Sequence, residues 1–99
     1  MQVTGWKSSR VGGTLGLRVG KENAQRFFPR NWHSVGVELD GQRVIVPITN
    51  TFWTSCPELR SPFIRDFLEE HGLAHWRKGR PPKLRLLPRP GNTFVVSLE

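Results

Sequence analysis

Short apolar runs with a two-residue period constrain the fold of this chain more than any other feature of its sequence. The clearest pair flanks Asp40-Gly41, where every second residue from Val35 to Ile48 is apolar on both sides of the dipeptide. Alternation is typical of half-buried strands, and Asp-Gly between two such runs is a strong hairpin signal. The pattern predicts a β-hairpin whose second strand lies at a sheet edge, because Pro47 cannot donate to a ladder. Similar alternation predicts strands at residues 15–19, 84–86 and 94–98.

Two segments break this period and predict helices. The first ends at Pro29, and we expect one buried face to hold Ala24, Phe27 and Phe28. The second begins with Ser61 as N-cap and Pro62 at the first helical position, and Gly72 ends it. Its apolar face comprises Phe63, Ile64, Phe67 and Leu68. Many short strands with two short helices predict a small barrel, of mostly β or α+β class.

The size of the chain fits one domain spanning residues 1–99. No apolar stretch approaches the roughly 20 residues of a membrane-spanning helix, so we expect no membrane partner. Cys56 is the single cysteine, which suits a reducing compartment and predicts a cytoplasmic protein. The closing Leu98-Glu99 has the form of a cloning scar, which would make this an excised part of a longer protein.

Positive charge is the strongest functional signal in the sequence. The chain holds 15 Lys and Arg against 8 Asp and Glu, and 11 of the 15 are Arg. Six of them lie between Arg77 and Arg89, with no acid among them. A small domain with a pI near 11.1 is most easily explained by a polyanionic partner. Arginine is favoured where bidentate contacts to phosphate or guanine matter, which indicates nucleic acid.

The first candidate binding element is a loop at residues 6–13. Lys7 and Arg10 are suited to phosphates or a guanine edge, and Ser8 and Ser9 are short donors that fit close to a nucleic-acid backbone. The alternative is a solvated hairpin loop whose charge is incidental.

The second candidate element is Asn50–Arg60, which has no period and is expected to be a loop. It contains side chains for each kind of base-edge contact: amide for adenine, guanidinium for guanine, carboxylate for a cytosine amine, and threonine for a thymine methyl. The candidate contact residues are Asn50, Thr51, Trp53, Thr54, Ser55, Glu58 and Arg60. The alternatives are that Phe52, Trp53 and Leu59 pin a structured loop, and that Glu58 and Arg60 pair with each other. For Trp53, core packing and a stacking contact are equally compatible with the sequence.

Basic residues outside these loops are suited to phosphate contacts. Arg30 follows the first helix, and Lys78 and Arg80 lie in an irregular basic segment. The alternatives are a helix-exit turn and a solvated basic turn.

Motifs for catalysis and metal binding are missing from the sequence. No Asp or Glu is followed two residues later by Lys, as the common metal-dependent nuclease centre requires, and the chain contains no Tyr. The spacing of His71 and His75 suits a shared metal on one helix, but Gly72 interrupts that helix. We therefore expect no catalytic residue, metal or cofactor.

The order of these elements resembles a known family. The segments Leu15–Pro29 and Val35–Gly41, with Leu59–Ile64 and Pro81–Leu84, resemble the DNA-binding pseudobarrel of plant B-three transcription factors and of the N-terminal effector domain of EcoRII-type restriction endonucleases. The resemblance implies a seven-stranded open β-barrel with two short helices. It also implies two arms that enter the DNA major groove, at residues 7–13 and 50–60. The plant members carry a Trp near the start of the second helix, where this chain has Pro62-Phe63-Ile64, and this difference favours the bacterial branch.

Together, the residues and the resemblance predict a non-catalytic domain that binds double-stranded DNA sequence-specifically. The resemblance implies the recognition module of a restriction endonuclease, monomeric when isolated and fused to a catalytic domain in the full-length protein. Three alternatives remain: a small barrel that binds single strands or RNA, a basic protein-interaction domain, and a swapped-hairpin dimeric regulator.

Overall fold

The alternating runs form seven strands in the computed structural model, which describes residues 1–9 and 13–99. The strands are β1 (Gln2–Lys7), β2 (Leu15–Arg18), β3 (Ser34–Leu39), β4 (Gln42–Pro47), β5 (Glu58–Arg60), β6 (Lys83–Arg89) and β7 (Thr93–Leu98). Two helices complete the fold, α1 (Lys21–Phe27) and α2 (Pro62–Glu70). None of the helices in these ranges is long and apolar enough to cross a membrane.

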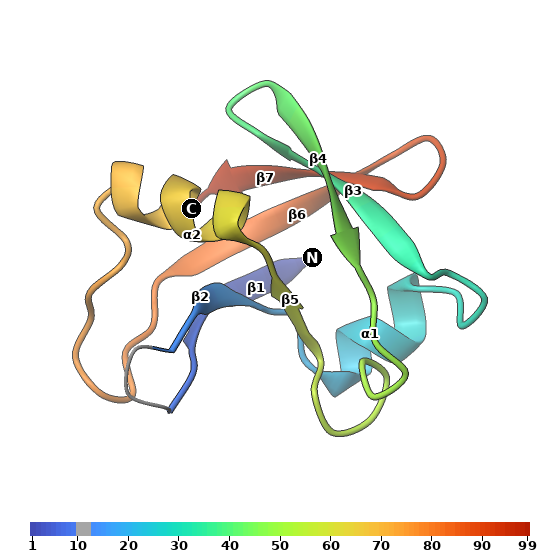
Figure 1. The fold of residues 1–99 in the computed structure, drawn as a ribbon, viewed down its shortest axis with the longest axis horizontal. Helices are drawn as coiled ribbons and strands as arrows, with labels where there is room; N and C mark the ends of the chain where they lie inside the picture. The colour runs from blue at the N-terminus through green and yellow to red at the C-terminus, as the bar shows by residue number, and fades with distance from the viewer. Residues whose placement is uncertain (10–12) are drawn as a thin grey trace.

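The strands belong to one sheet that nearly closes into a barrel (Figure 1). Their order is β4-β3-β7-β6-β1-β2-β5, and every pair is antiparallel except β3 and β7. The edge strands β4 and β5 approach each other but share no ladder, which leaves one open seam. The prediction of a mostly β, seven-stranded open barrel with two short helices is therefore confirmed.

The hairpin predicted at Asp40-Gly41 joins β3 to β4. Both turn residues have positive φ, 52° at Asp40 and 83° at Gly41, as a two-residue type I′ turn requires. Leu39 pairs with Gln42 directly before and after the turn. Pro47 ends β4 at the edge of the sheet, as predicted, where its missing N–H breaks no ladder.

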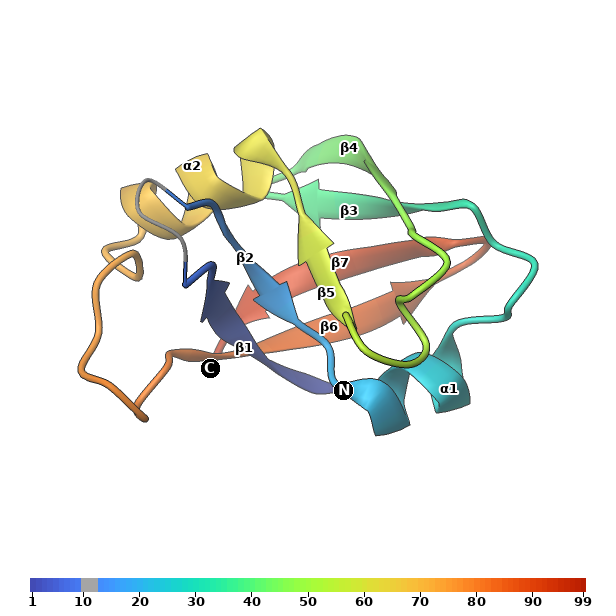
Figure 2. The same cartoon turned by 60° about the horizontal axis from the view of Figure 1, so that its bottom comes forward.

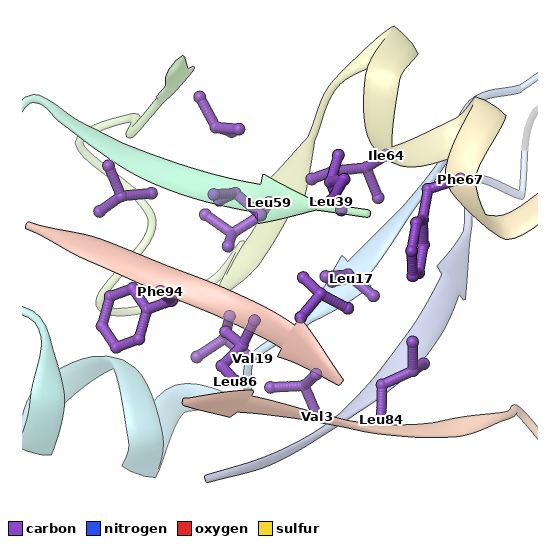
Figure 3. Packing of buried hydrophobic residues seen from close by; sticks show 14 of the residues in the cluster. Val3, Leu17, Val19, Leu39, Leu59, Ile64, Phe67, Leu84, Leu86 and Phe94 are labelled. Carbon is purple, nitrogen blue, oxygen red and sulfur yellow. The ribbon is translucent and has the colours of Figure 1, made fainter. Parts of the chain in front are cut away.

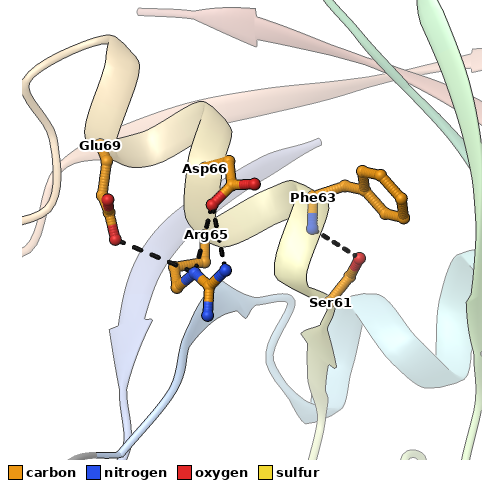
Figure 4. A network of polar contacts seen from close by, with 5 residues as sticks. All are labelled: Ser61, Phe63, Arg65, Asp66 and Glu69. Carbon is orange, nitrogen blue, oxygen red and sulfur yellow. Dashed lines mark hydrogen bonds and ion pairs between the residues drawn. The ribbon is translucent and has the colours of Figure 1, made fainter.

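Helix α2 begins and ends at the predicted residues. The Ser61 hydroxyl accepts a hydrogen bond from the Phe63 N–H at 3.1 Å, and Pro62 occupies the first turn (Figure 4). Gly72, with φ 69°, follows the last turn. Ile64, Phe67 and Leu68 are buried, but Phe63 is 53% exposed. The apolar face predicted for α2 is therefore buried only in part, because Phe63 borders an open pocket beside Leu39 and Val44 and does not enter the core.

Helix α1 differs from its prediction in one residue. Ala24 and Phe28 are buried, whereas Phe27 is 39% exposed and lies under the Arg26 guanidinium, 5.3 Å from its ring centre. The backbone leaves the helical conformation at Phe28, with φ −122° and ψ 101°. This change turns Phe28 inward, so the two phenylalanines do not share a face.

The core fills the barrel with side chains from both ends of the chain (Figure 3). Phe28 packs against Phe52 and Phe94, with ring centres 5.0 and 4.9 Å apart, and Trp32 lies against the same cluster. These aromatic contacts hold α1 and the β4–β5 connection on the barrel wall.

Candidate nucleic-acid interface

The strand register aligns polar side chains in rows across the outer face of β6, β1, β2 and β5. Directly paired residues in antiparallel strands point to the same face. Thr4 pairs with Lys83 on one side and Arg18 on the other, and Arg18 pairs with Glu58. Arg85 pairs with Gln2 in the neighbouring row. We call this outer surface, with Arg18, Arg60, Lys83 and Arg85, the basic sheet face.

A second row on this face brings Arg60 onto an aromatic ring. Trp6, Gly16 and Arg60 are successive partners across β1, β2 and β5. Because Gly16 has no side chain, the Arg60 guanidinium reaches over it and lies 4.8 Å from the centre of the Trp6 ring. A cation held over an indole in this way keeps its donors free at the edge of its plane.

The two loops selected from the sequence flank the basic sheet face. The first loop leaves the end of β1 beside the Trp6 row, and the second loop enters β5 beside the Glu58 row (Figure 2). They lie at opposite ends of the β2–β5 ladder, so the face spans the distance between them. The predicted loop Asn50–Arg60 is too long at its end, since Glu58–Arg60 form β5 and pair with β2. A three-residue edge strand with one apolar side chain has no period that the sequence could display.

In the first loop, the structure describes Lys7, Ser8 and Ser9, while Arg10 lies outside the described residues. The Lys7 ammonium sits 4.8 Å from the centre of the Trp76 ring. The Ser8 N–H donates to the Thr14 carbonyl at 3.0 Å, so the loop base keeps hairpin geometry. Lys7 and Ser9 are exposed and Ser8 is half-buried.

The basic segment that contains Lys78 and Arg80 folds back onto β1. Gly5 donates its N–H to the Pro82 carbonyl at 2.9 Å, and a Cβ at Gly5 would lie 2.8 Å from the Pro82 ring. The same segment meets the first loop through Trp76, whose ring lies next to Lys7, and its cations Lys78 and Arg80 are exposed. Arg30 is also exposed, but it lies in the connection from α1 to β3, outside the basic sheet face.

The second loop is a structured element. The Trp53 indole N–H donates to the Phe28 carbonyl at 2.7 Å, and the Gln25 side chain donates to the Trp53 carbonyl at 3.1 Å. The Thr51 carbonyl accepts from the N–H groups of Thr54 and Cys56, both at 3.0 Å. The polar candidates of this loop are exposed: Asn50, Thr51, Thr54 and Ser55.

Trp53 is a correction to the set of candidate contact residues. Its side chain is 6% exposed and packs edge-on against Phe52, with ring centres 5.4 Å apart. A ring buried on both faces offers no surface for a base, so of the two alternatives for Trp53 the structure has core packing. Its role is to pin the second loop to α1.

Glu58 and Arg60 form the ion pair that the sequence left as an alternative. Arg60 Nη2 lies 3.5 Å from Glu58 Oε1. The Glu58 side chain is 6% exposed, while that of Arg60 remains largely in solvent. The pair places a recessed acceptor next to a projecting donor at the same edge of the sheet.

Arg18 and Arg85 belong to this surface, although no motif in the sequence singled them out. Lys83 and Arg85 alternate with buried Leu84 and Leu86, so the two-residue period already placed them outside the barrel. What the period did not show was that β6, β1, β2 and β5 are neighbours, which brings their outward residues together.

Most cations of the described chain are free of acidic partners. Among these residues, the ion pairs of Lys and Arg involve only Arg60 and Arg65, and the described Lys and Arg are all exposed. Three of the acids gather on α2 and at the β3–β4 turn, around one pocket: Asp40, Asp66 and Glu70. The basic sheet face is not free of acids, since Glu58 is the strand partner of Arg18 and Glu99 accepts from the Gln2 side chain beside Arg85.

Residues that could hold a metal are scattered in the fold. Within residues 1–9 and 13–99, no three His, Cys, Asp or Glu side chains come together as ligands. His71 instead contacts Asp40, with Nε2 and Oδ2 2.7 Å apart.

No family model, curated protein or solved structure gave a significant match to this chain.

Proposed function

We propose that this chain is a non-catalytic domain that binds double-stranded DNA sequence-specifically. The observation that carries the proposal is the basic sheet face, where the exposed Arg18, Lys83 and Arg85 have no acidic partner among the described residues and Arg60 projects from β5. Cations supply affinity for phosphates, and polar side chains on rigid loops supply specificity for base edges. A pinned second loop also supports this function, because a reading element must hold its geometry.

Duplex DNA fits this surface better than a single strand does. Single-strand binders use exposed aromatic rings as platforms for bases. Here Trp53 is buried, and the rings of Trp6 and Trp76 are each covered by a cation. Side chains suited to hydrogen bonding project from the surface instead.

The resemblance to the effector domain of EcoRII-type restriction endonucleases extends the proposal. In that reading the domain is the recognition module of a bacterial restriction enzyme, it acts in the cytoplasm, and a fused domain cuts the DNA. The two loops would enter the major groove as arms, with Lys78, Arg80 and Arg30 on the flanking phosphates.

Selection from a random pool of DNA duplexes, at about 0.15 M salt, tests the proposal because non-specific binding is suppressed there. An enriched short motif is the expected result. Salt-sensitive binding without enrichment would contradict sequence-specific readout and favour a general nucleic-acid binder. Preferential enrichment of single strands in a parallel pool would favour the single-strand or RNA-binding barrel.

A further inference from the structure

One buried carboxylate oxygen at the start of β5 lacks a donor. Glu58 Oε1 is paired with Arg60, but Oε2 is buried and has no hydrogen-bond partner among the described residues. A carboxylate oxygen held away from water without a donor is unfavourable. An occupant that brings an N–H group to this carboxylate would remove that cost.

Glu58 lines a pocket of about 340 Å³ next to the open seam of the barrel. The walls come from the end of β4, the second loop and β5, and are formed by Pro47, Thr49, Thr51, Cys56, Glu58 and Arg60. The pocket is therefore built into the element proposed to read DNA. It is also bordered by polar hydroxyls, as the Thr49 and Thr51 Oγ1 atoms lie 3.2 Å apart on its rim.

The Glu58–Arg60 pair is complementary to one particular base pair. A C·G pair presents two acceptors of guanine, N7 and O6, next to the N4 amino donor of cytosine in the major groove. In the protein, Arg60 Nη2 lies 3.5 Å from Glu58 Oε1, so donors stand next to an acceptor. The donors of Arg60 match the guanine acceptors, and the acceptor of Glu58 matches the cytosine amine. Because the last torsion of Glu is broad, the carboxylate can turn either oxygen to the amine.

We propose that Glu58 and Arg60 together read one C·G base pair, with Glu58 accepting from cytosine N4 and Arg60 donating to guanine. The inference rests on the proposed DNA-binding function and adds what the site recognises. An A·T pair would set the adenine amino donor against the Arg60 donors. At such a pair the thymine O4 acceptor would also face the Glu58 carboxylate, so both side chains disfavour A·T.

Base analogues test each half of this readout on the motif selected from the duplex pool. In N4-methylcytosine, a methyl group replaces the N4 hydrogen that faces the major groove, while the N4 hydrogen that pairs with guanine remains. In 7-deazaguanine, a C–H group replaces the N7 acceptor. Each analogue, placed at one C·G position, should weaken wild-type binding about five- to a hundredfold, the range expected for losing a specific base contact. Inosine changes only the minor groove, so inosine opposite cytosine should leave binding unchanged.

Variants of the protein show which residue is responsible for each loss of affinity. The N4-methylcytosine penalty should vanish in Glu58→Ala and Glu58→Leu, whose side chains have no acceptor, and the 7-deazaguanine penalty should vanish in Arg60→Ala. Glu70→Gln makes the same charge change on α2, where Glu70 is exposed, and should retain both penalties. Circular dichroism of each variant checks that it is folded, and Glu58→Leu, which fills the space of the carboxylate with apolar atoms, keeps the test valid should Glu58→Ala not fold.

The outcomes separate this inference from the function on which it rests. An enriched motif without a C·G position sensitive to both analogues, or penalties that persist in the Glu58 and Arg60 variants, would overturn the C·G readout and leave sequence-specific binding intact. A pool without any enriched motif would overturn both.

Discussion

Gly16 shows how a single missing side chain shapes the surface. It stands between Trp6 and Arg60 in the strand register, and the absence of a Cβ lets these two side chains meet. The same absence lets β2 approach β5, because a Cβ at Gly16 would lie 2.5 Å from the Leu59 carbonyl oxygen. One residue thus serves both the packing of the edge strand and the presentation of Arg60.

Gly16→Ala should destabilise the domain by about 1–3 kcal/mol, as overpacking does in a tight site. The clash is with backbone, which cannot rotate away as a flexible side chain can. Urea unfolding measures the change in free energy, and an unchanged slope with denaturant would show that the unfolded state is comparable. A midpoint equal to that of the wild type would contradict the close approach of β2 and β5.

Arg60→Ala and Lys78→Ala should affect DNA binding in different ways. Arg60 is proposed to contact a base, so its loss should cost about 1–3 kcal/mol on the selected site and relax the preference at one position. Lys78 is proposed to contact phosphate and should weaken all sequences alike.

Titrations of the selected and a random duplex, at one salt concentration, distinguish the roles of Arg60 and Lys78. Arg43→Ala is the control, since Arg43 lies on β4, outside the basic sheet face. Equal losses on both duplexes for Arg60→Ala and Lys78→Ala would contradict the assignment of a reading role to Arg60.

At the scale of elements, α2 illustrates a helix that is specified locally. The Ser61 hydroxyl caps its first turn, and Gly72 follows its last.

Ser61→Ala removes the cap and should destabilise the domain by about 1 kcal/mol. Ser61→Asp restores an acceptor and should recover most of that loss. Thermal unfolding of the three proteins measures the effect, and equal losses in both variants would show that the cap does not matter.

The second loop is an element whose order depends on a distant contact. Its Trp53 indole donates to the Phe28 carbonyl, 25 residues away along the chain. Trp53→Phe keeps an aromatic ring but leaves that carbonyl without its donor, which should cost about 1–3 kcal/mol of stability.

Trp32→Phe is the matched control for Trp53→Phe. Within the described residues the Trp32 indole donates no hydrogen bond, although its ring packs on Phe28 and Phe94. Denaturant unfolding compares the two, and a loss in Trp32→Phe at least as large as in Trp53→Phe would contradict the role of the indole hydrogen bond.

For the whole molecule, the number of phosphates that the basic sheet face contacts predicts how binding depends on salt. Each phosphate neutralised by the basic sheet face should steepen the plot of log affinity against log salt by about 0.9 for B-form DNA. Replacing Arg18 and Arg85 by Ala should therefore flatten the slope by about two. Both side chains are exposed, so the fold should tolerate the change.

A second double variant tests whether this effect belongs to the face. Arg26 and Arg43 are also exposed, on α1 and β4, and replacing both by Ala removes the same charge from outside the basic sheet face. That variant should keep the wild-type slope. Equal flattening in the two double variants would show that DNA responds to net charge and not to the basic sheet face.

Local patterns along the chain predicted most of the elements. The type I′ turn at Asp40-Gly41, the cap at Ser61 and the inward Leu84 and Leu86 all follow from neighbours within a few residues. Such features are encoded by short-range sterics and hydrogen bonding, which a sequence displays directly. Phe63 was misjudged because helical spacing says which residues share a side and not how much of that side the barrel covers. Phe27 was misjudged because the helix ends before Phe28, which helical spacing does not show.

By itself, the sequence determined the alternating strands, the two helices, the excess of arginine and the loops that carry polar side chains. Only the tertiary structure decided that β1, β2, β5 and β6 are neighbours, that Trp53 is buried, and that Glu58 is recessed beside Arg60. Pairing between strands separated by tens of residues depends on how the whole barrel buries its apolar faces. No local period encodes that choice, and it is this choice that gathers scattered cations into one face.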